Sequence, residues 1–433
     1  MSYRDTLAYL YGLQRFGIKL GLHNIARLLE ALDNPHRALT VLHIGGTNGK
    51  GSTAAMAGAI LRAAGLHVGL YTSPHLTAFT ERIQVDHRPI PEAQAVALAD
   101  AVRAAAEREE ALRPTFFEFT TAMALVHFAR ERVDVAVLEV GLGGRLDATN
   151  VVRPAAAIIT NVGLDHLQYL GKTVEEIARE KAGIIKPGVP VLTGARPHQG
   201  LEVIEETCAE RGAPLSVLGD AIAAEPAGSG RFHYRSRSWT LRDLELNLRG
   251  RHQVWNAALA VAGVECLAQE GLPVSDAAVR QGLREVIWPG RLEVLRQRPT
   301  VLLDGAHNPD GAEALRCSLR EEFRYHRLLL VIGILEDKDI PGILGVLAPL
   351  SDELWLCRAR AARAADLELL REHAAPLARR LTCCPTVPDA LRQALARAGP
   401  ADLICVTGSL YVVGEARAWL LGETSAEPAA GVR

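Results

Sequence analysis

Short apolar runs, separated by longer segments of mixed character, recur along most of this chain. The runs lack a clean alternation of apolar and polar residues, which predicts strands buried on both faces, as in a parallel sheet covered by helices. In the first part of the chain the predicted strands are 39–44, 68–71, 133–140, 156–160 and 190–193. The segments between or after them carry helical patterns at 54–64, 92–108, 120–130, 173–182 and 200–211. This order predicts an α/β fold.

The order of strand and helix patterns is interrupted by one alternating segment and then resumes in a second α/β unit. Residues 231–248 alternate apolar and polar side chains, which predicts an antiparallel patch, and residues 255–269 return to a helical pattern. A second α/β unit starts near Arg296, with predicted strands at 300–303, 328–332, 353–357 and 403–406 and predicted helices at 311–322, 366–377 and 389–398. Pro289 and Gly290 break the pattern between the two units. We therefore expect an N-terminal domain of residues 1–290, a C-terminal domain of residues 291–422 and a disordered tail at 423–433.

Composition narrows the class of protein. A chain of 433 residues is too long for one hydrophobic core, in agreement with two domains. The net charge of −2 gives no electrostatic reason to expect nucleic acid or an anionic membrane as a partner. No apolar stretch reaches the roughly 20 residues that span a membrane, and the first residues do not resemble a signal peptide. The seven scattered cysteines are expected to be reduced thiols in a cytoplasmic protein.

A glycine-rich segment between a predicted strand and a predicted helix carries the clearest chemistry. It consists of Gly46, Thr47, Asn48, Gly49, Lys50, Gly51, Ser52 and Thr53. Strand, glycine loop, lysine, hydroxyl and helix is the order of a phosphate-binding loop, whose backbone N–H groups surround phosphate oxygens. Lys50 would reach the β- and γ-phosphates, and Ser52 would offer its hydroxyl to Mg²⁺. The alternative is a tight turn without a ligand, since Gly51 stands where the common motif has Ser or Thr.

Polar residues follow other predicted strands and are candidates for a metal site. Glu139 ends a predicted strand, and His166 follows the next one. Ligands of open α/β sheets bind at the carboxyl ends of strands, so a carboxylate and a neutral imidazole there are suited to Mg²⁺. Ser73, in the loop after another strand, would add a hydroxyl oxygen. The alternatives are a surface carboxylate, a surface histidine and an ordinary loop.

Lys181 lies near the end of a predicted helix. On local physics alone it offsets the helix macrodipole and has no further role.

Taken together, these motifs resemble the Mur ligase superfamily and, within it, the folylpolyglutamate synthase and dihydrofolate synthase family. Eight runs carry the resemblance in order, at 46–53, 73–83, 138–150, 159–166, 180–184, 288–293, 304–309 and 407–411. One such motif would be weak evidence, but an ordered series from Gly46 to Tyr411 covers nearly the whole chain. The resemblance implies a P-loop-type ATPase domain with a parallel sheet, followed by a smaller Rossmann-like α/β domain.

The resemblance also implies site residues. Members of the family hold Mg²⁺ through residues that match Ser73, Glu139 and His166, and the lysine that matches Lys181 is carbamylated and helps to order a second Mg²⁺. A monovalent cation is a further expectation. ATP-binding positions match Asn256, Arg291 and Asp304. Positions that bind the pterin match Ile18, Lys19, Leu20, Gly21, Thr115, Phe116, Phe117, Glu118, Leu146, Asp147 and Ala148. His307 and Ser409 match positions near the incoming glutamate.

The implied reaction is an ATP-dependent amide ligation. ATP would phosphorylate a folate or dihydropteroate carboxylate, and the amine of L-glutamate would attack the acyl phosphate, with Lys50, His166 and Lys181 as the catalytic residues. The expected partners are small molecules, and the family resemblance favours a monomer. Two alternatives remain, a Mur-type ligase that acts on a UDP-linked cell-wall precursor and a nucleotide switch without ligase chemistry.

Overall fold

The computed structural model describes residues 2–16, 21–109, 112–228 and 230–423, and it divides the chain into two compact units. Unit 1 consists of Met1–His75, Phe79–Asn247 and His252–Ile287. Unit 2 consists of Leu76–Ala78, Leu248–Arg251 and Trp288–Arg433. The sequence placed the division between domains after residue 290. The tail predicted to be disordered lies, apart from Glu423, outside the described residues.

An eight-stranded sheet forms the centre of unit 1, with the order β4-β3-β2-β5-β1-β6-β7-β8. Its strands are β1 (Val41–Gly45), β2 (Val68–Tyr71), β3 (Ile83–Val85), β4 (Arg88–Pro89), β5 (Val135–Glu139), β6 (Ala156–Ile159), β7 (Val191–Thr193) and β8 (Leu215–Val217). All neighbours from β2 to β8 pair in parallel, and only β3 and β4 are antiparallel. The parallel sheet predicted from the apolar runs is confirmed. The pattern missed β3, β4 and β8 because these short strands have two or three residues and carry no apolar run.

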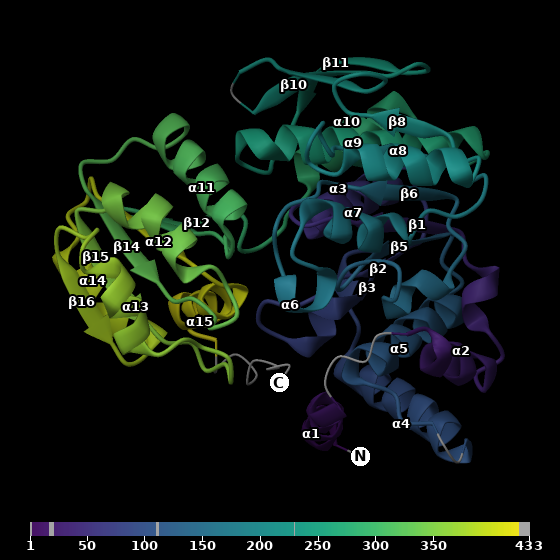
Figure 1. Cartoon of the computed structure of the whole chain (residues 1–433), viewed down its shortest axis with the longest axis horizontal. Helices are drawn as coiled ribbons and strands as arrows, with labels where there is room; N and C mark the ends of the chain where they lie inside the picture. Colours follow the sequence, from purple (N-terminus) through teal and green to yellow (C-terminus); the bar gives the residue numbers. More distant parts are fainter. Residues whose placement is uncertain (1, 17–20, 110–111, 229, 424–433) are drawn as a thin grey trace. The chain divides into compact units, whose positions relative to one another are not determined.

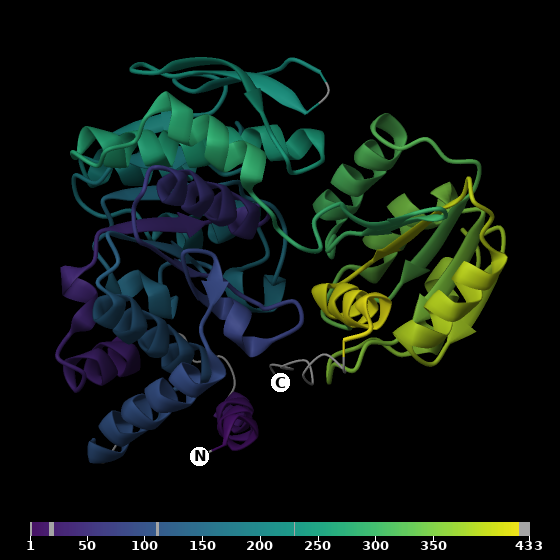
Figure 2. The same ribbon diagram turned by 180° about the vertical axis from the view of Figure 1, so that it is seen from behind.

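Helices cover both faces of this sheet (Figure 1). They are α1 (Tyr3–Gly12), α2 (His23–Glu30), α3 (Lys50–Ala63), α4 (Glu92–Arg108), α5 (Phe116–Glu131), α6 (Leu167–Leu170), α7 (Val174–Ala182), α8 (Leu201–Glu210), α9 (Arg251–Gln269) and α10 (Asp276–Glu285). On one face, Gly263 of α9 lies against the side chains of Leu42 and Ile158, and α10 packs on α3 (Figure 2). One core on the opposite face unites α1, α2, α4 and α5, and a second unites α7 and α8.

Several helices begin earlier than the sequence predicted, and two of these have predicted site residues in their first turns. The helix expected from residue 54 begins at Lys50, so Lys50 to Thr53 form its first turn. The apolar pattern did not predict this turn because its residues are small or polar. Such residues are common in the first turn of a helix, where the backbone N–H groups have no partner within the helix. The helix expected from residue 120 begins at Phe116, where a capping box between Thr115 and Glu118 satisfies two N–H groups.

The antiparallel patch predicted at 231–248 is confirmed as part of a three-stranded sheet in the order β11-β10-β9. Its strands are β9 (Ala223–Pro226), β10 (Arg231–Arg235) and β11 (Thr240–Glu245). Alternate residues of β10 and β11, such as Phe232 and Leu244, are buried, which is the source of the alternation. The Tyr234 hydroxyl donates to Glu265 Oε2 at 2.7 Å and so joins this sheet to α9.

Unit 2 contains a six-stranded sheet in the order β12-β13-β17-β14-β15-β16, in which only β12 is antiparallel. Its strands are β12 (Glu293–Gln297), β13 (Thr300–Leu303), β14 (Leu328–Ile332), β15 (Glu353–Cys357), β16 (Leu381–Cys384) and β17 (Leu403–Thr407). Its helices are α11 (Pro309–Glu321), α12 (Ile340–Leu347), α13 (Leu367–Ala374), α14 (Val387–Arg397) and α15 (Leu410–Leu421). Two hydrophobic cores, one on each face, confirm a second α/β unit.

Among the described residues, no helix combines the length and the apolar character that crossing a membrane requires.

Candidate active site

The glycine-rich loop leaves the central strand of the unit 1 sheet. β1 pairs with β5 on one side and with β6 on the other, in registers that place Ile44 beside Glu139 and Gly45 beside Ile159. The connection from β1 crosses toward β2, whereas the connection from β6 runs the other way to β7. Such a reversal at the carboxyl edge of a parallel sheet is where ligands bind in open α/β folds.

Hydrogen bonds to the segment after β6 hold the loop in shape. The Asn48 backbone N–H donates to Asn161 Oδ1 at 2.9 Å, and Asn161 Nδ2 donates to the Asn48 carbonyl at 3.1 Å. Thr160 Oγ1 donates to the same carbonyl at 2.6 Å, and Thr47 Oγ1 donates to the Gly163 carbonyl at 3.1 Å. These bonds pre-form the loop, so a phosphate would find its N–H donors already ordered.

Two lysine side chains converge on this loop. Lys50 Nζ donates to the carbonyls of Gly46 and Thr47 at 3.1 and 3.0 Å, and Lys181 Nζ donates to the Gly46 carbonyl at 2.9 Å. Lys181 is only 3 % exposed, so its side chain does not extend into solvent at the end of the helix. Burial is the main cause that lowers the pKa of Lys181, the nearby Lys50 adds to the shift and Asp165 opposes it, and the resulting pKa is about 7. Its amine therefore titrates near neutrality, and a neutral amine is nucleophilic.

Glu139 and Ser73 lie together where two neighbouring strands end. Glu139 is the last residue of β5, is 5 % exposed, and accepts a hydrogen bond from the Ser73 backbone N–H at 3.0 Å. The two residues are far apart in sequence, but β2 and β5 are adjacent in the sheet. The structure thus brings a buried carboxylate and a serine hydroxyl to one edge beside the glycine loop.

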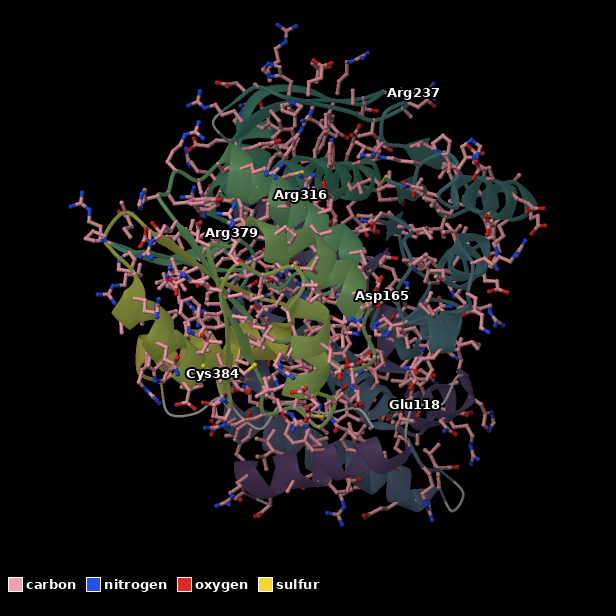
Figure 3. The ribbon with its side chains drawn as sticks, turned by 60° about the vertical axis from the view of Figure 1, so that its left-hand side comes forward. Glu118, Asp165, Arg237, Arg316, Arg379 and Cys384 are labelled. Carbon is pink, nitrogen blue, oxygen red and sulfur yellow. The ribbon has the colours of Figure 1, made fainter. Side chains whose placement is uncertain are left out.

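His166 follows β6 on the other side of β1. Its backbone adopts a left-handed conformation with φ of 52°, and its Nε2 lies 3.9 Å from Asp165 Oδ1. Figure 3 shows Asp165 in this part of unit 1. Glu139 and the segment that carries His166 therefore lie on opposite sides of the loop 46–49.

The predicted metal set fits the chemistry of Mg²⁺ in its donor atoms. Ser73 and Ser52 offer hydroxyl oxygens and Glu139 a carboxylate, while His166 offers the softer imidazole nitrogen. Within the described ranges, no three His, Cys, Asp or Glu side chains gather to hold a metal ion by themselves. The predicted set mixes hydroxyl, carboxylate and imidazole ligands, and it stays a prediction.

Asn256 contacts the loop from α9. A Cβ at Gly49, whose φ is 84°, would lie 2.4 Å from Asn256 Oδ1, so only glycine permits this approach. Gln253 links the two regions, because it accepts from Asn256 Nδ2 at 3.0 Å and donates to Ser52 Oγ at 3.3 Å. Thr53, which begins the buried side of α3, is fully buried.

The predicted pterin residues at the start of α5 also have structural roles. Thr115 and Glu118 form the capping box of this helix, and Figure 3 labels Glu118. Phe116 is 6 % exposed and lies beneath the guanidinium of Arg82, which is 5.2 Å from the ring centroid. The Phe117 ring lies 6.0 Å from that of Tyr71. Their burial fits a core as well as the wall of a ligand site, so the pterin-binding role stays a prediction.

Asp147 is buried in the loop after β5. Its Oδ2 accepts from the Leu142 N–H at 2.9 Å, and its Oδ1 accepts from the N–H and hydroxyl of Thr149 at 3.0 and 2.5 Å. Burial raises the pKa of Asp147, and these hydrogen bonds oppose the shift. Leu146 is half-buried and Ala148 is buried. Gly21 begins the described segment with φ of 148°, and Ile18, Lys19 and Leu20 lie outside the described residues.

The remaining predicted residues belong to unit 2. Asp304 follows β13 and accepts hydrogen bonds from the N–H groups of Leu292 and Ala306, both at 3.0 Å. Burial raises the pKa of Asp304, and the charge of Arg291 partly opposes this shift. His307 Nδ1 lies 2.9 Å from the Gly305 carbonyl. Ser409 caps α15 and is 2 % exposed.

Sequence reasoning missed Asn161, Thr160 and Gln253. Asn161 and Thr160 stand within the run 159–166, where their place directly after a strand was the available signal. Gln253 had no signal, because only the packing of α9 brings it to Ser52.

Comparisons with known proteins agree with this geometry. Residues 44–264 match the Mur ligase middle domain, and residues 290–410 match the Mur ligase glutamate ligase domain. The dihydrofolate synthase/folylpolyglutamate synthase of Bacillus subtilis is 36 % identical, and the alignment covers 96 % of this chain and 98 % of that protein. A probable bifunctional folylpolyglutamate synthase/dihydropteroate synthase of Haloferax volcanii is 43 % identical over 96 % of this chain, which spans about half (50 %) of that longer protein.

Solved structures give the same result. Escherichia coli FolC in complex with DHPP and ADP has a TM-score of 0.90 and 34 % identity, with 98 % of each chain covered. Mycobacterium tuberculosis folylpolyglutamate synthase complexed with ADP and AMPPCP has a TM-score of 0.89 and 34 % identity, with 98 % of this chain and 100 % of that chain covered.

Proposed function

The chain belongs to the Mur ligase superfamily and, within it, to the folylpolyglutamate synthase and dihydrofolate synthase family, and we propose that it joins L-glutamate to a folate or dihydropteroate carboxylate at the expense of ATP. The observation that carries the proposal is the meeting of Lys50 and Lys181 at the Gly46 carbonyl, beside the buried carboxylate of Glu139. This arrangement of cations and carboxylate suits the transfer of a phosphoryl group.

The reaction begins with activation of a poor electrophile. A carboxylate resists attack by an amine, so its oxygen first attacks the γ-phosphorus of ATP, and ADP leaves. The ordered N–H groups of the loop and the Lys50 ammonium stabilise the charge that develops on the transferring group. The glutamate amine then attacks the acyl carbon, and phosphate leaves from the tetrahedral intermediate. The products are ADP, phosphate and an amide.

Mg²⁺ would be held by Ser73, Glu139 and His166, with Ser52 at the nucleotide, and it supplies positive charge that neutralises the phosphate oxygens. A second Mg²⁺ and a monovalent cation extend this proposal. Lys181 has the features that carbamylation requires, because its buried amine has a pKa near neutrality and CO₂ reacts with the neutral amine. A carbamate on Nζ would replace a buried cation by an anion close to the proposed metal site.

In this proposal the loop 46–53 binds ATP, Arg291 and Asp304 are further nucleotide-binding residues, and His307 and Ser409 bind glutamate. The pterin residues are those named above, with Asp147 as the acceptor of hydrogen bonds from the pteridine ring. We further propose a cytoplasmic monomer whose partners are small molecules.

The test is phosphate release from ATP with Mg²⁺ and L-glutamate, with 7,8-dihydropteroate or a reduced folate as the acceptor. Release with both acceptors indicates a bifunctional enzyme, and release with one identifies a dihydrofolate synthase or a folylpolyglutamate synthase. Release that needs neither acceptor contradicts the proposal. Lys50→Ala is the control, and its kcat/KM should fall by about a hundredfold or more.

A further inference from the structure

A row of side-chain hydrogen bonds joins the middle of β1 to Asp147. His43 Nε2 lies 2.8 Å from Thr149 Oγ1, and Thr149 Oγ1 lies 2.5 Å from Asp147 Oδ1. His43 and Thr149 are fully buried, and Asp147 is 6 % exposed. Buried polar groups are costly unless each is paired, so a row of three in a hydrophobic sheet is a specific arrangement. The mechanism above uses only its last member.

The donors and acceptors of this row have one consistent order. Both carboxylate oxygens of Asp147 accept backbone N–H bonds, so Asp147 acts as an acceptor, and the Thr149 hydroxyl donates its single hydrogen to it. Toward His43 the same hydroxyl can then only accept. Burial lowers the pKa of His43 to about 3, so the ring is neutral and carries one N–H. That hydrogen must lie on Nε2, which leaves Nδ1 as an unprotonated nitrogen.

The other ring nitrogen agrees with this order. Among the described residues, His43 Nδ1 is a buried atom without a hydrogen-bond partner. With the hydrogen on Nε2, the ring makes its one N–H hydrogen bond and leaves no buried N–H group unpaired. The surroundings of both ring nitrogens therefore favour the tautomer with its hydrogen on Nε2.

The position of His43 connects two parts of the proposed site. His43 precedes Gly46 by three residues, and the Gly46 carbonyl accepts from both Lys50 and Lys181. Thr149 and Asp147 belong to the loop after β5, the strand that ends at Glu139. The row thus ties the loop after β5 to the rigid central strand that also carries the nucleotide loop.

We propose that His43 is a positioning residue that, through the Thr149 hydroxyl, fixes the carboxylate of Asp147 for the acceptor substrate. The inference rests on the proposed function, in which Asp147 accepts hydrogen bonds from the pteridine ring. The paired N–H groups of a 2-amino-4-oxopteridine match a carboxylate in two parallel hydrogen bonds, and such recognition depends on the rotation of the carboxylate. Loss of the Nε2–H donor frees the Thr149 hydroxyl and with it that rotation.

The kinetic test compares His43→Leu, which removes the donor, with His43→Gln, whose amide N–H can reach the place of Nε2. We expect His43→Leu to raise the KM of the acceptor about tenfold and to leave the KM of ATP within about twofold. His43→Gln should restore most of the affinity for the acceptor. His127→Leu, which removes another buried imidazole at 5 % exposure on α5, is the matched control and should change neither KM.

A second pair of variants covers the case in which His43→Leu fails to fold. Thr149→Val keeps the shape of the side chain but removes the hydroxyl, and Thr149→Ser keeps the hydroxyl. The proposal expects the valine variant to reproduce the rise in acceptor KM and the serine variant to resemble the wild type. Equal rises in the KM of ATP and of the acceptor would overturn it in favour of a role in the fold of β1. An unchanged acceptor KM in folded His43→Leu or Thr149→Val would also overturn it.

The tautomer of His43 can be read without any substrate, by NMR of protein with ¹⁵N-labelled histidine. The expected spectrum has a protonated Nε2 and an unprotonated Nδ1, and the Nε2 signal should change in Thr149→Val. An Nδ1–H tautomer would overturn the proposed order of donors. If no acceptor is turned over at all, the proposed function fails, while this spectrum still decides whether the hydrogen-bonded row exists.

Discussion

At the scale of single residues, two lysine side chains lie close together beside the glycine loop, and one of them is buried. Lys50 and Lys181 donate to one carbonyl oxygen, that of Gly46. Burial cuts Lys181 off from water and lowers its pKa, and repulsion from the nearby Lys50 lowers the pKa in the same direction. A buried lysine near neutrality is a marker of function because an ordinary helix-end lysine would extend into solvent.

The carbamate proposal for Lys181 leads to a dependence on pH. Since the pKa of Lys181 is about 7, the neutral amine is scarce below that pH and predominates above it. Protein depleted of CO₂ should therefore regain activity on addition of bicarbonate as a source of CO₂. With the concentration of dissolved CO₂ held constant, it should do so faster as the pH rises from about 6 to about 8. Lys181→Ala should be inactive, should remain folded by circular dichroism, and should not respond to bicarbonate.

The matched control for this experiment is Lys172→Ala, which removes an exposed lysine. It should behave as the wild type at every pH. Wild-type activity in Lys181→Ala would remove the carbamate role.

The second residue-scale prediction concerns Glu139. Glu139→Gln keeps the shape of the side chain and an oxygen for the Ser73 N–H, but it removes the negative charge. We expect kcat/KM at saturating Mg²⁺ to fall about a hundredfold, while folate binding without nucleotide, measured by calorimetry, changes little. Glu131→Gln on α5, whose side chain is 40 % exposed, serves as the control. Equal losses in turnover and folate binding would point to a structural carboxylate.

At the scale of elements, close packing of helices on the central sheet places the glycine loop. α10 lies against α3, and a Cβ at Gly282 would be 2.4 Å from Ile60 Cα. Backbone atoms cannot give way as a flexible side chain can, so this position needs glycine. The first turn of α3 contains Lys50, so the packing that positions this helix also positions the proposed phosphate site.

A pair of glycine variants tests that packing. Gly282→Ala should lower the free energy of unfolding by about 1–3 kcal/mol through overpacking. Gly58→Ala, within α3, adds a methyl group that meets nothing closer than 3.9 Å, at His87 Cε1. It should raise the stability by about 0.5–1 kcal/mol through its higher helix propensity. Urea unfolding monitored by circular dichroism measures both, and similar values for the two would contradict the close contact.

At the scale of the whole molecule, the chain forms two units, each with its own sheet and its own cores. Unit 1 contains the glycine loop, Glu139 and Lys181, whereas unit 2 contains Arg291, Asp304, His307 and Ser409. The predicted site residues are thus divided between the two units.

Hydrogen exchange on the full chain tests which residues bind the nucleotide. MgADP should slow exchange most strongly in β1, in the loop 46–49 and at the start of α3, because binding orders the N–H donors there. Lys50→Ala should largely abolish this protection at the same nucleotide concentration. Protection confined to unit 2 would contradict the assignment of the nucleotide loop.

The sequence by itself determined the class of fold and the chemistry of the loop. Apolar runs of strand length needed no tertiary information to predict a parallel sheet, and β2 and α4 occur with the predicted bounds. Gly46 to Thr53 form a contiguous motif, so their chemistry can be predicted from the sequence alone. Ordered motifs likewise predicted the family, which the comparisons confirmed.

Only the tertiary structure decided which distant residues meet. On local sequence physics Lys181 only offsets a helix macrodipole, and its pKa falls because folding buries it against Gly46 and near Lys50. Asn161 supports the loop because β6 pairs with β1, and His43 reaches Asp147 only through Thr149, more than a hundred residues away (separation 106). Burial and electrostatic coupling depend on distances in space, and a pattern along the chain carries no such distances.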